Sequence, residues 1–98
     1  MDYEIVIKPD AEIDIRDAVK WYEDKKEGLG LRFIKELDQK LIKIRNQPLL
    51  YQKRYKLVRM AILSVFKEAI HFTVEENRVY VHAVLATARD PKIWNKLS

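Results

Sequence analysis

The spacing of apolar residues changes near the middle of this chain, and this change restricts the possible fold more than any other feature. In residues 10–46, apolar side chains recur every three or four positions, as at Ala11, Ile15 and Ala18. In residues 57–87 they form three β-like runs separated by short links. Short links favour antiparallel neighbours in a sheet. We therefore expect helices first and an antiparallel sheet afterwards.

The first half predicts one strand and two amphipathic helices. YEIVI, at residues 3–7, is β-branched and apolar and stops at Lys8-Pro9, which is typical of a strand. Asp10 is expected to cap the first helix, because its carboxylate can accept backbone N–H groups. The glycines of KKEGLG permit left-handed geometry and should end this helix. A second helical stripe follows and should end at NQP, residues 46–48.

The second half predicts three strands. They are LVRMAILSVF, AIHFTVEE and RVYVHAVLAT, at residues 57–66, 69–76 and 78–87. A two-residue loop after the second run would place Ile70 opposite Ala83 and His71 opposite His82. One sheet face would then be apolar and the other polar and aromatic.

The predicted fold class is α+β, in the order β-α-α-β-β-β. A helical hairpin is expected to pack on one face of a mostly antiparallel four-stranded sheet. We expect a single domain over residues 1–98, because a chain of 98 residues supports one core.

Charge is unevenly distributed along the chain. The net formal charge is +4, and hydrophobic and charged residues make up 48% and 35%, which excludes a disordered composition. Residues 1–50 hold 10 Lys+Arg and 11 Asp+Glu, a net of −1, whereas residues 51–98 hold 9 and 4, a net of +5. The basic half suits nucleic acid or an acidic protein segment, and it is equally compatible with a solvated surface.

Several function classes are excluded by what the sequence lacks. The absence of cysteine rules out disulfides and thiolate metal sites. His71 and His82 are too few for a catalytic zinc, so we expect a surface histidine pair and no metal. There is no phosphate-binding glycine loop and no nucleophile motif, so neither a cofactor nor a small-molecule substrate is expected. The acidic start is unlike a signal peptide and no apolar run could cross a membrane, so we expect a cytoplasmic protein without membrane partners.

One basic segment is a candidate binding surface. YQKRYKLVR, at residues 51–59, interleaves cations with Tyr51 and Tyr55. Cations neutralise phosphates, and aromatic faces can stack on unpaired bases. The residues predicted to bind the target or nucleic acid are Lys53, Arg54, Lys56, Arg59, Arg89 and Lys92.

The motifs, taken in order, resemble a known family. They are A-E-x-D-I-R-D-A-V-x-W-Y, E-G-L-G-L-R-F, Q-P-x-x-Y-x-x-R-Y, V-R-x-A-I-L and V-x-A-V-L-x-T-x-R-D-P-x-x-W. Each is weak alone, but their order and spacing over residues 3–94 resemble the RelE/ParE superfamily. Its members are the toxins of type II toxin–antitoxin (plasmid stabilisation) modules.

The resemblance implies the β-α-α-β-β-β fold, a basic toxin that inhibits growth, and a cognate antitoxin protein that silences it. RelE-like members cleave mRNA on the ribosome, and they use basic residues to orient the 2′-hydroxyl and stabilise the transition state. ParE-like members block DNA gyrase and are not enzymes. A catalytic role would fall on Arg59 and Arg89.

This chain departs from the family pattern at Ala86, Ala88 and Val65, where relatives often carry histidine, serine and arginine. Alanine can neither transfer a proton nor donate a side-chain hydrogen bond. These positions favour a ParE-like toxin that acts by binding, because binding needs contacts and no proton transfer. The alternatives are a RelE-like, ribosome-dependent mRNA endonuclease and an inactive relic that only binds an antitoxin.

Overall fold

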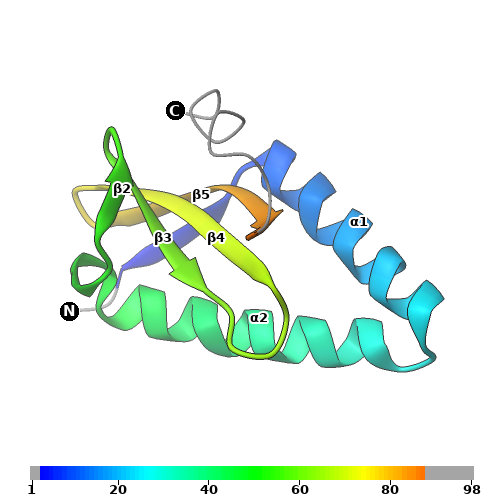
Figure 1. The fold of residues 1–98 in the computed structure, drawn as a ribbon. Coiled ribbons are helices and arrows are strands. Elements are labelled where there is room, and N and C mark those ends of the chain that lie inside the picture. The colour runs from blue at the N-terminus through cyan, green and yellow to red at the C-terminus, as the bar shows by residue number, and fades with distance from the viewer. Residues whose placement is uncertain (1–2, 88–98) are drawn as a thin grey trace.

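The computed structural model describes residues 3–87 of the chain. Two helices pack on a mixed, mostly antiparallel sheet (Figure 1). The predicted α+β class and helical hairpin are therefore confirmed, although the sheet has five strands instead of four. In chain order the elements are β1 (Glu4–Ile7), α1 (Pro9–Lys25), α2 (Leu29–Asn46), the 3-10 helix η1 (Pro48–Leu50), β2 (Lys53–Tyr55), β3 (Val58–Ile62), β4 (Glu68–Glu75) and β5 (Arg78–Ala86).

The sheet order is β1-β5-β4-β3-β2, so the last strand lies beside the first (Figure 1). Strand β1 runs parallel to β5, and all other neighbouring pairs are antiparallel. The additional strand is β2, which pairs with β3 and forms one edge of the sheet that residues 3–87 build. An edge strand of three polar or half-buried residues carries no period-two apolar pattern, which explains why the sequence did not predict it.

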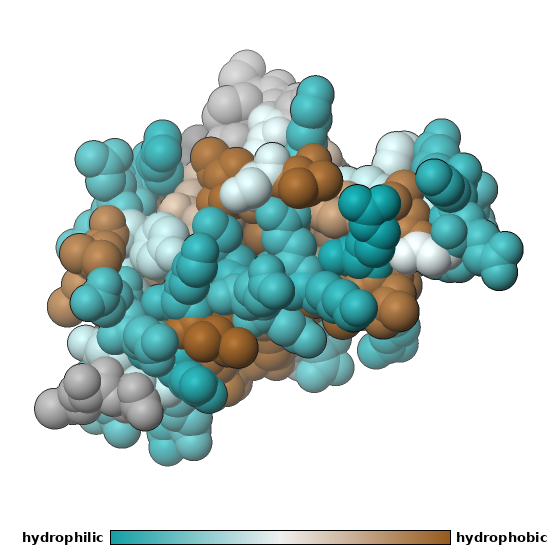
Figure 2. Space-filling model, turned by 90° about the horizontal axis from the view of Figure 1, so that it is seen from below, coloured by the Kyte–Doolittle hydropathy of each residue, from teal (hydrophilic) through white to brown (hydrophobic). Residues whose placement is uncertain are grey.

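The helices bury the stripes that their spacing indicates. Helix α2 ends at Asn46 as expected, and Phe33, Leu37 and Ile44 are buried on its inner side. Its outer surface is mainly hydrophilic, with hydrophobic side chains in separate patches (Figure 2). The expected cap at Asp10 is wrong, because α1 begins at Pro9 and its cap residue is Lys8, two positions earlier. Proline is favoured at the first helical position, because a backbone N–H there has no hydrogen-bond partner within the helix.

A β-bulge changes the register between β4 and β5. Phe72 pairs with Val81 as expected from the two-residue turn, but His71 pairs with Ala83. His82 is therefore the extra residue of the bulge. The predicted opposition of His71 and His82 is wrong for this reason, and so is that of Ile70 and Ala83.

The bulge also exchanges core residues. Val84 pairs with Ile70 and joins the core between sheet and helices, in the place predicted for Ala83. His71, expected at the surface, has no exposed area. Within residues 3–87, no helix is long and apolar enough to cross a membrane.

Candidate functional site

The basic hairpin, residues 53–59, is formed by β2, a turn and the start of β3. Lys53, Arg54 and Lys56 are exposed on it, and the backbone of Lys56 is left-handed, with φ of 48°. Arg59 pairs with Lys53 across the two strands. The fold thus brings together four of the cations that the sequence analysis selected.

Arg59 differs from the other three cations, because its guanidinium is already engaged. Its Nη1 donates a hydrogen bond of 2.6 Å to the carbonyl oxygen of Tyr51. This bond ties β3 to the segment that enters β2. Three cations therefore face the solvent, while Arg59 also holds the hairpin in place.

The two tyrosines of this segment pack inward. Tyr51 lies edge-to-face against Phe72, with 5.8 Å between ring centroids. The Tyr55 hydroxyl shares a hydrogen bond of 2.9 Å with Nδ1 of His71. Burial raises the pKa of both phenols, so both stay protonated at neutral pH. The basic hairpin therefore offers cations to a partner, but neither ring stands free to stack on a base.

Burial lowers the pKa of both histidines of the sheet. Burial lowers the pKa of His71 to about 4, so its ring is neutral at physiological pH. His82 is half-buried, its Nε2 lies 2.8 Å from Oγ1 of Thr73, and burial and then Lys8 lower its pKa. Across residues 3–87, no group of three or more histidine, aspartate or glutamate side chains could hold a metal ion.

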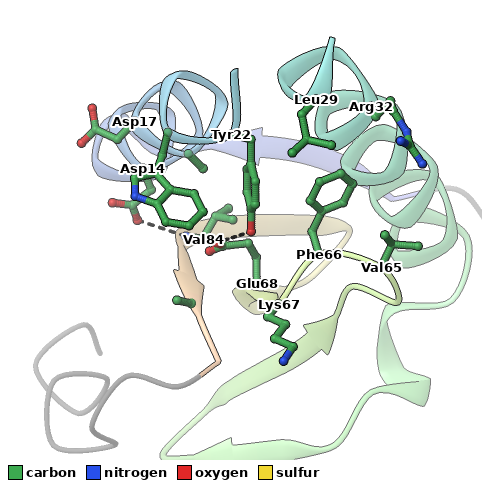
Figure 3. A pocket seen from close by; sticks show the side chains of 13 residues that line it. Asp14, Asp17, Tyr22, Leu29, Arg32, Val65, Phe66, Lys67, Glu68 and Val84 are labelled. Carbon is green, nitrogen blue, oxygen red and sulfur yellow. Dashed lines mark hydrogen bonds between the residues drawn. The ribbon is translucent and has the colours of Figure 1, made fainter. Parts of the chain in front are cut away.

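A second feature, which the sequence analysis missed, is a pocket of about 750 Å³ near the link that joins the two helices (Figure 3). It lies between α1, the start of α2, the β3–β4 loop (residues 63–67) and the end of β5. Val65 and Ala86, two of the positions that depart from the family pattern, line it.

A buried carboxylate stabilises the pocket. Glu68, expected in a turn, begins β4 instead and is only 9% exposed. It accepts a hydrogen bond of 3.0 Å from the Tyr22 hydroxyl (Figure 3). Burial and then Glu68 raise the pKa of Tyr22 to about 12, so this hydroxyl remains a donor. Asp14 accepts a bond of 3.0 Å from the amide of Val84, which joins α1 to β5.

The β3–β4 loop is held by a single carboxylate from α2. Glu36 accepts hydrogen bonds from the amides of Ser64, Val65 and Phe66, at 2.9, 3.1 and 3.2 Å. Partial burial raises the pKa of Glu36, but these amides outweigh it, so the pKa lies below its ordinary value. The loop therefore presents Val65 in a defined conformation.

Two residues of the predicted site, Arg89 and Lys92, lie outside the described residues, and so does Ala88, one of the positions that depart from the family pattern. Lys53, Arg54, Lys56 and Arg59 lie on one hairpin, and their binding role stays a prediction.

Comparison with solved structures identifies the fold. One similar chain belongs to a structure described as the chromosomal ParDE TA system from P. aeruginosa. The match has a TM-score of 0.77 and 10% sequence identity, and covers 86% of this chain and 95% of that chain. This protein has the fold of that ParDE chain. The fold that the RelE/ParE resemblance implied is thereby confirmed. No protein-family model and no curated protein matches the sequence.

Proposed function

We propose that this protein is the toxin of a type II toxin–antitoxin module, and that it inhibits growth by binding DNA gyrase. A cognate antitoxin protein neutralises it. The observation that carries the proposal is the likeness to a chain of a ParDE system, which extends over most of both chains. The sequence motifs support the same conclusion independently of the coordinates.

Binding is favoured over RNA cleavage by the chemistry of the described residues. Val65 and Ala86 are apolar where many relatives carry arginine and histidine. His71 is buried and neutral, and Arg59 is bonded to a backbone carbonyl. A general acid or base must reach its substrate with a suitable pKa. His71 does not meet this requirement, because it is buried and its pKa is about 4.

The basic hairpin supplies the contact surface in this proposal. Lys53, Arg54 and Lys56 protrude at a sheet edge, where a partner can approach without disturbing the core. Clustered positive charge accelerates association with an acidic surface and fixes its orientation. The same three cations could contact phosphates, which keeps a ribosome-dependent mRNA endonuclease as the second candidate.

Inducing the chain alone separates the candidates, with growth, mRNA 5′ ends and plasmid supercoiling measured together. A gyrase-binding toxin arrests growth and relaxes the plasmid while mRNA stays intact. New mRNA ends at codon boundaries would establish the endonuclease instead. Normal growth would leave only a relic that binds an antitoxin.

A charge reversal tests the role of the basic hairpin. The double variant Lys53→Glu, Arg54→Glu should abolish growth arrest, because an acidic target would then be repelled. Lys43→Glu, Arg45→Glu is the matched control, since both residues are exposed cations that lie outside the hairpin, in the last turn of α2. Full arrest by the first variant would place the target surface elsewhere.

A further inference from the structure

The edge of the sheet at the basic hairpin exposes apolar side chains together with its cations. Leu49 and Leu50, on η1, are 58% and 74% exposed, and Leu57, in the turn of the hairpin, is 69% exposed. Nine large apolar residues of the described chain are exposed, and these three fall within nine consecutive positions. Apolar residues scattered singly on a surface are normal, whereas a group of them is typical of an interaction site.

The core needs none of these three leucines. Helix η1 buries Pro48 and leaves the two leucines that follow it in solvent. The hairpin turn consists of Lys56 and Leu57, and the backbone of Lys56 is left-handed, with φ of 48°. Tight turns of this kind favour glycine, asparagine and aspartate. A leucine exposed in such a turn adds nothing to the core, so its contribution lies at the surface.

The backbone between the leucines is fixed by its neighbours in the sheet. The Tyr51 ring packs against Phe72, and the Tyr51 carbonyl oxygen accepts a hydrogen bond of 2.6 Å from Arg59. The Tyr55 hydroxyl lies 2.9 Å from Nδ1 of His71. The exposed residues therefore lie between fixed points. A partner that binds them does not have to order the segment first, which lowers the entropic cost of binding.

The exposed charge along this edge is positive. Lys53, Arg54 and Lys56 lie between the leucines of η1 and the leucine of the turn, and residues 48–59 contain no carboxylate. Glu75 ends β4 and Glu76 follows it, and strand β3 lies between them and β2 (Figure 1). These two carboxylates against the four cations of the basic hairpin leave a net charge of +2. The ion pairs that the structure shows within residues 3–87 involve none of these cations.

We propose that the β2 edge, residues 49–57, binds an acidic segment on the surface of a protein, and that this protein is the target. Apolar side chains of the segment cover the leucines, and its carboxylates pair with the cations between them. The inference rests on the proposed function for the identity of the partner, whereas the chemistry of the bound segment follows from the edge itself.

The residues of the β2 edge favour a protein over a nucleic acid. Unpaired bases are bound largely by stacking on aromatic rings. Both tyrosine rings of the segment pack inward, so they are not free for stacking. A leucine makes no hydrogen bond to a phosphate, whereas apolar side chains of a protein surface remove it from water. The leucines therefore favour a toxin that binds a protein over an mRNA endonuclease.

Panning a random linear peptide library against the full chain tests which segment binds. The recovered peptides should combine carboxylates with large apolar residues. Leu50→Ser, Leu57→Ser should weaken their binding about tenfold or more, because the burial of two leucines is lost. The matched control is Leu31→Ser, Ile42→Ser, since both residues are exposed aliphatic side chains of α2. The control should bind the peptides as the original chain does.

Salt separates the contribution of the leucines from that of the cations. In about 1 M NaCl the Debye length falls to about 3 Å, so the loss of binding caused by Lys53→Glu, Arg54→Glu should shrink. The loss caused by the leucine variant should persist. Single-stranded RNA and DNA oligonucleotides, followed by fluorescence anisotropy, should bind more weakly than the peptides. Far-ultraviolet circular dichroism of each variant confirms that the fold is retained.

Three results would overturn the proposal. They are recovery of no binding peptide, peptides that bind the leucine variant as tightly as the original chain, and an oligonucleotide that binds more tightly than every selected peptide.

The result is distinguishable from that of the proposed function. Gyrase that supercoils DNA normally beside the purified chain, together with peptides that depend on the leucines, would remove the gyrase target and leave the β2 edge as a site for acidic protein segments. Inhibited gyrase, together with peptides that bind the leucine variant normally, would leave the gyrase target and remove the proposal for the β2 edge.

Discussion

His71 is the residue whose environment differs most from what its neighbours in sequence suggested. The ring is fully buried beside Tyr55, and burial lowers its pKa from 6.5 to about 4. The unfolded chain therefore binds a proton between these pH values that the native chain excludes. Stability from the neutral ring is complete above pH 6.5 and decreases as the pH falls toward 4.

We expect the free energy of unfolding to fall by about 3 kcal/mol more in the original chain than in His71→Gln over this pH range. Glutamine does not titrate, and its amide can still bond the Tyr55 hydroxyl. Urea denaturation at stepped pH measures both curves. Parallel curves would show that His71 does not control acid stability.

Glu36 is the second residue whose substitution should change the stability of the protein. Glu36→Gln removes a charged acceptor of three backbone amides, and should destabilise the protein by about 1 kcal/mol, since water screens this half-exposed site. The amides of Ser64, Val65 and Phe66 should exchange hydrogen faster than in the original chain. Asp38→Asn, on the exposed side of α2, is the control and should leave them unchanged. Unaltered exchange in Glu36→Gln would mean that the loop holds itself.

The junction of the two helices depends on two glycines with different roles. A Cβ on Gly30 would lie 2.9 Å from the carbonyl oxygen of Val19, so α1 and α2 could not approach as closely. Gly28 has φ of 88° but nothing within 4 Å of a built Cβ. The constraint at Gly28 is therefore its left-handed backbone conformation, which asparagine also tolerates.

Gly30→Ala should consequently cost about 1–3 kcal/mol of stability, through overpacking of the helix contact. Gly28→Asn should cost less than this. Thermal or urea unfolding of the two variants measures which of them loses more stability. Equal losses, or a larger loss for Gly28→Asn, would show that the helices do not meet closely at Gly30.

At the scale of elements, the spacing of apolar residues predicted the helices and the longer strands. It did not predict the features that depend on contacts between distant residues. Both helices and the three longer strands follow from apolar spacing. Strand β2 was not predicted, because its exposed cations form no alternating pattern of apolar residues. The bulge at His82 was not predicted, because an inserted residue leaves the residue types of a strand unchanged. It changes only which side chains face the core.

At the scale of the whole molecule, the same distinction separates the two candidate surfaces. The cations of the basic hairpin are close in sequence, so spacing alone could group them. The pocket combines residues from α1, α2, the β3–β4 loop and β5, and Tyr22 bonds Glu68 across 46 positions. No local pattern indicates such a site, because only the tertiary fold brings its walls together.

The basic hairpin and the pocket belong to one fold, which a ParDE chain shares. In the proposed function the basic hairpin contacts the target. This role requires binding and no proton-transfer group.

The most direct measurement is DNA supercoiling by purified gyrase in the presence of the purified full chain. We expect supercoiling to be inhibited as the protein is added, and to be restored for Lys53→Glu, Arg54→Glu while Lys43→Glu, Arg45→Glu inhibits fully. Undiminished supercoiling at saturating protein, with growth arrested in cells that express it, would contradict the gyrase target.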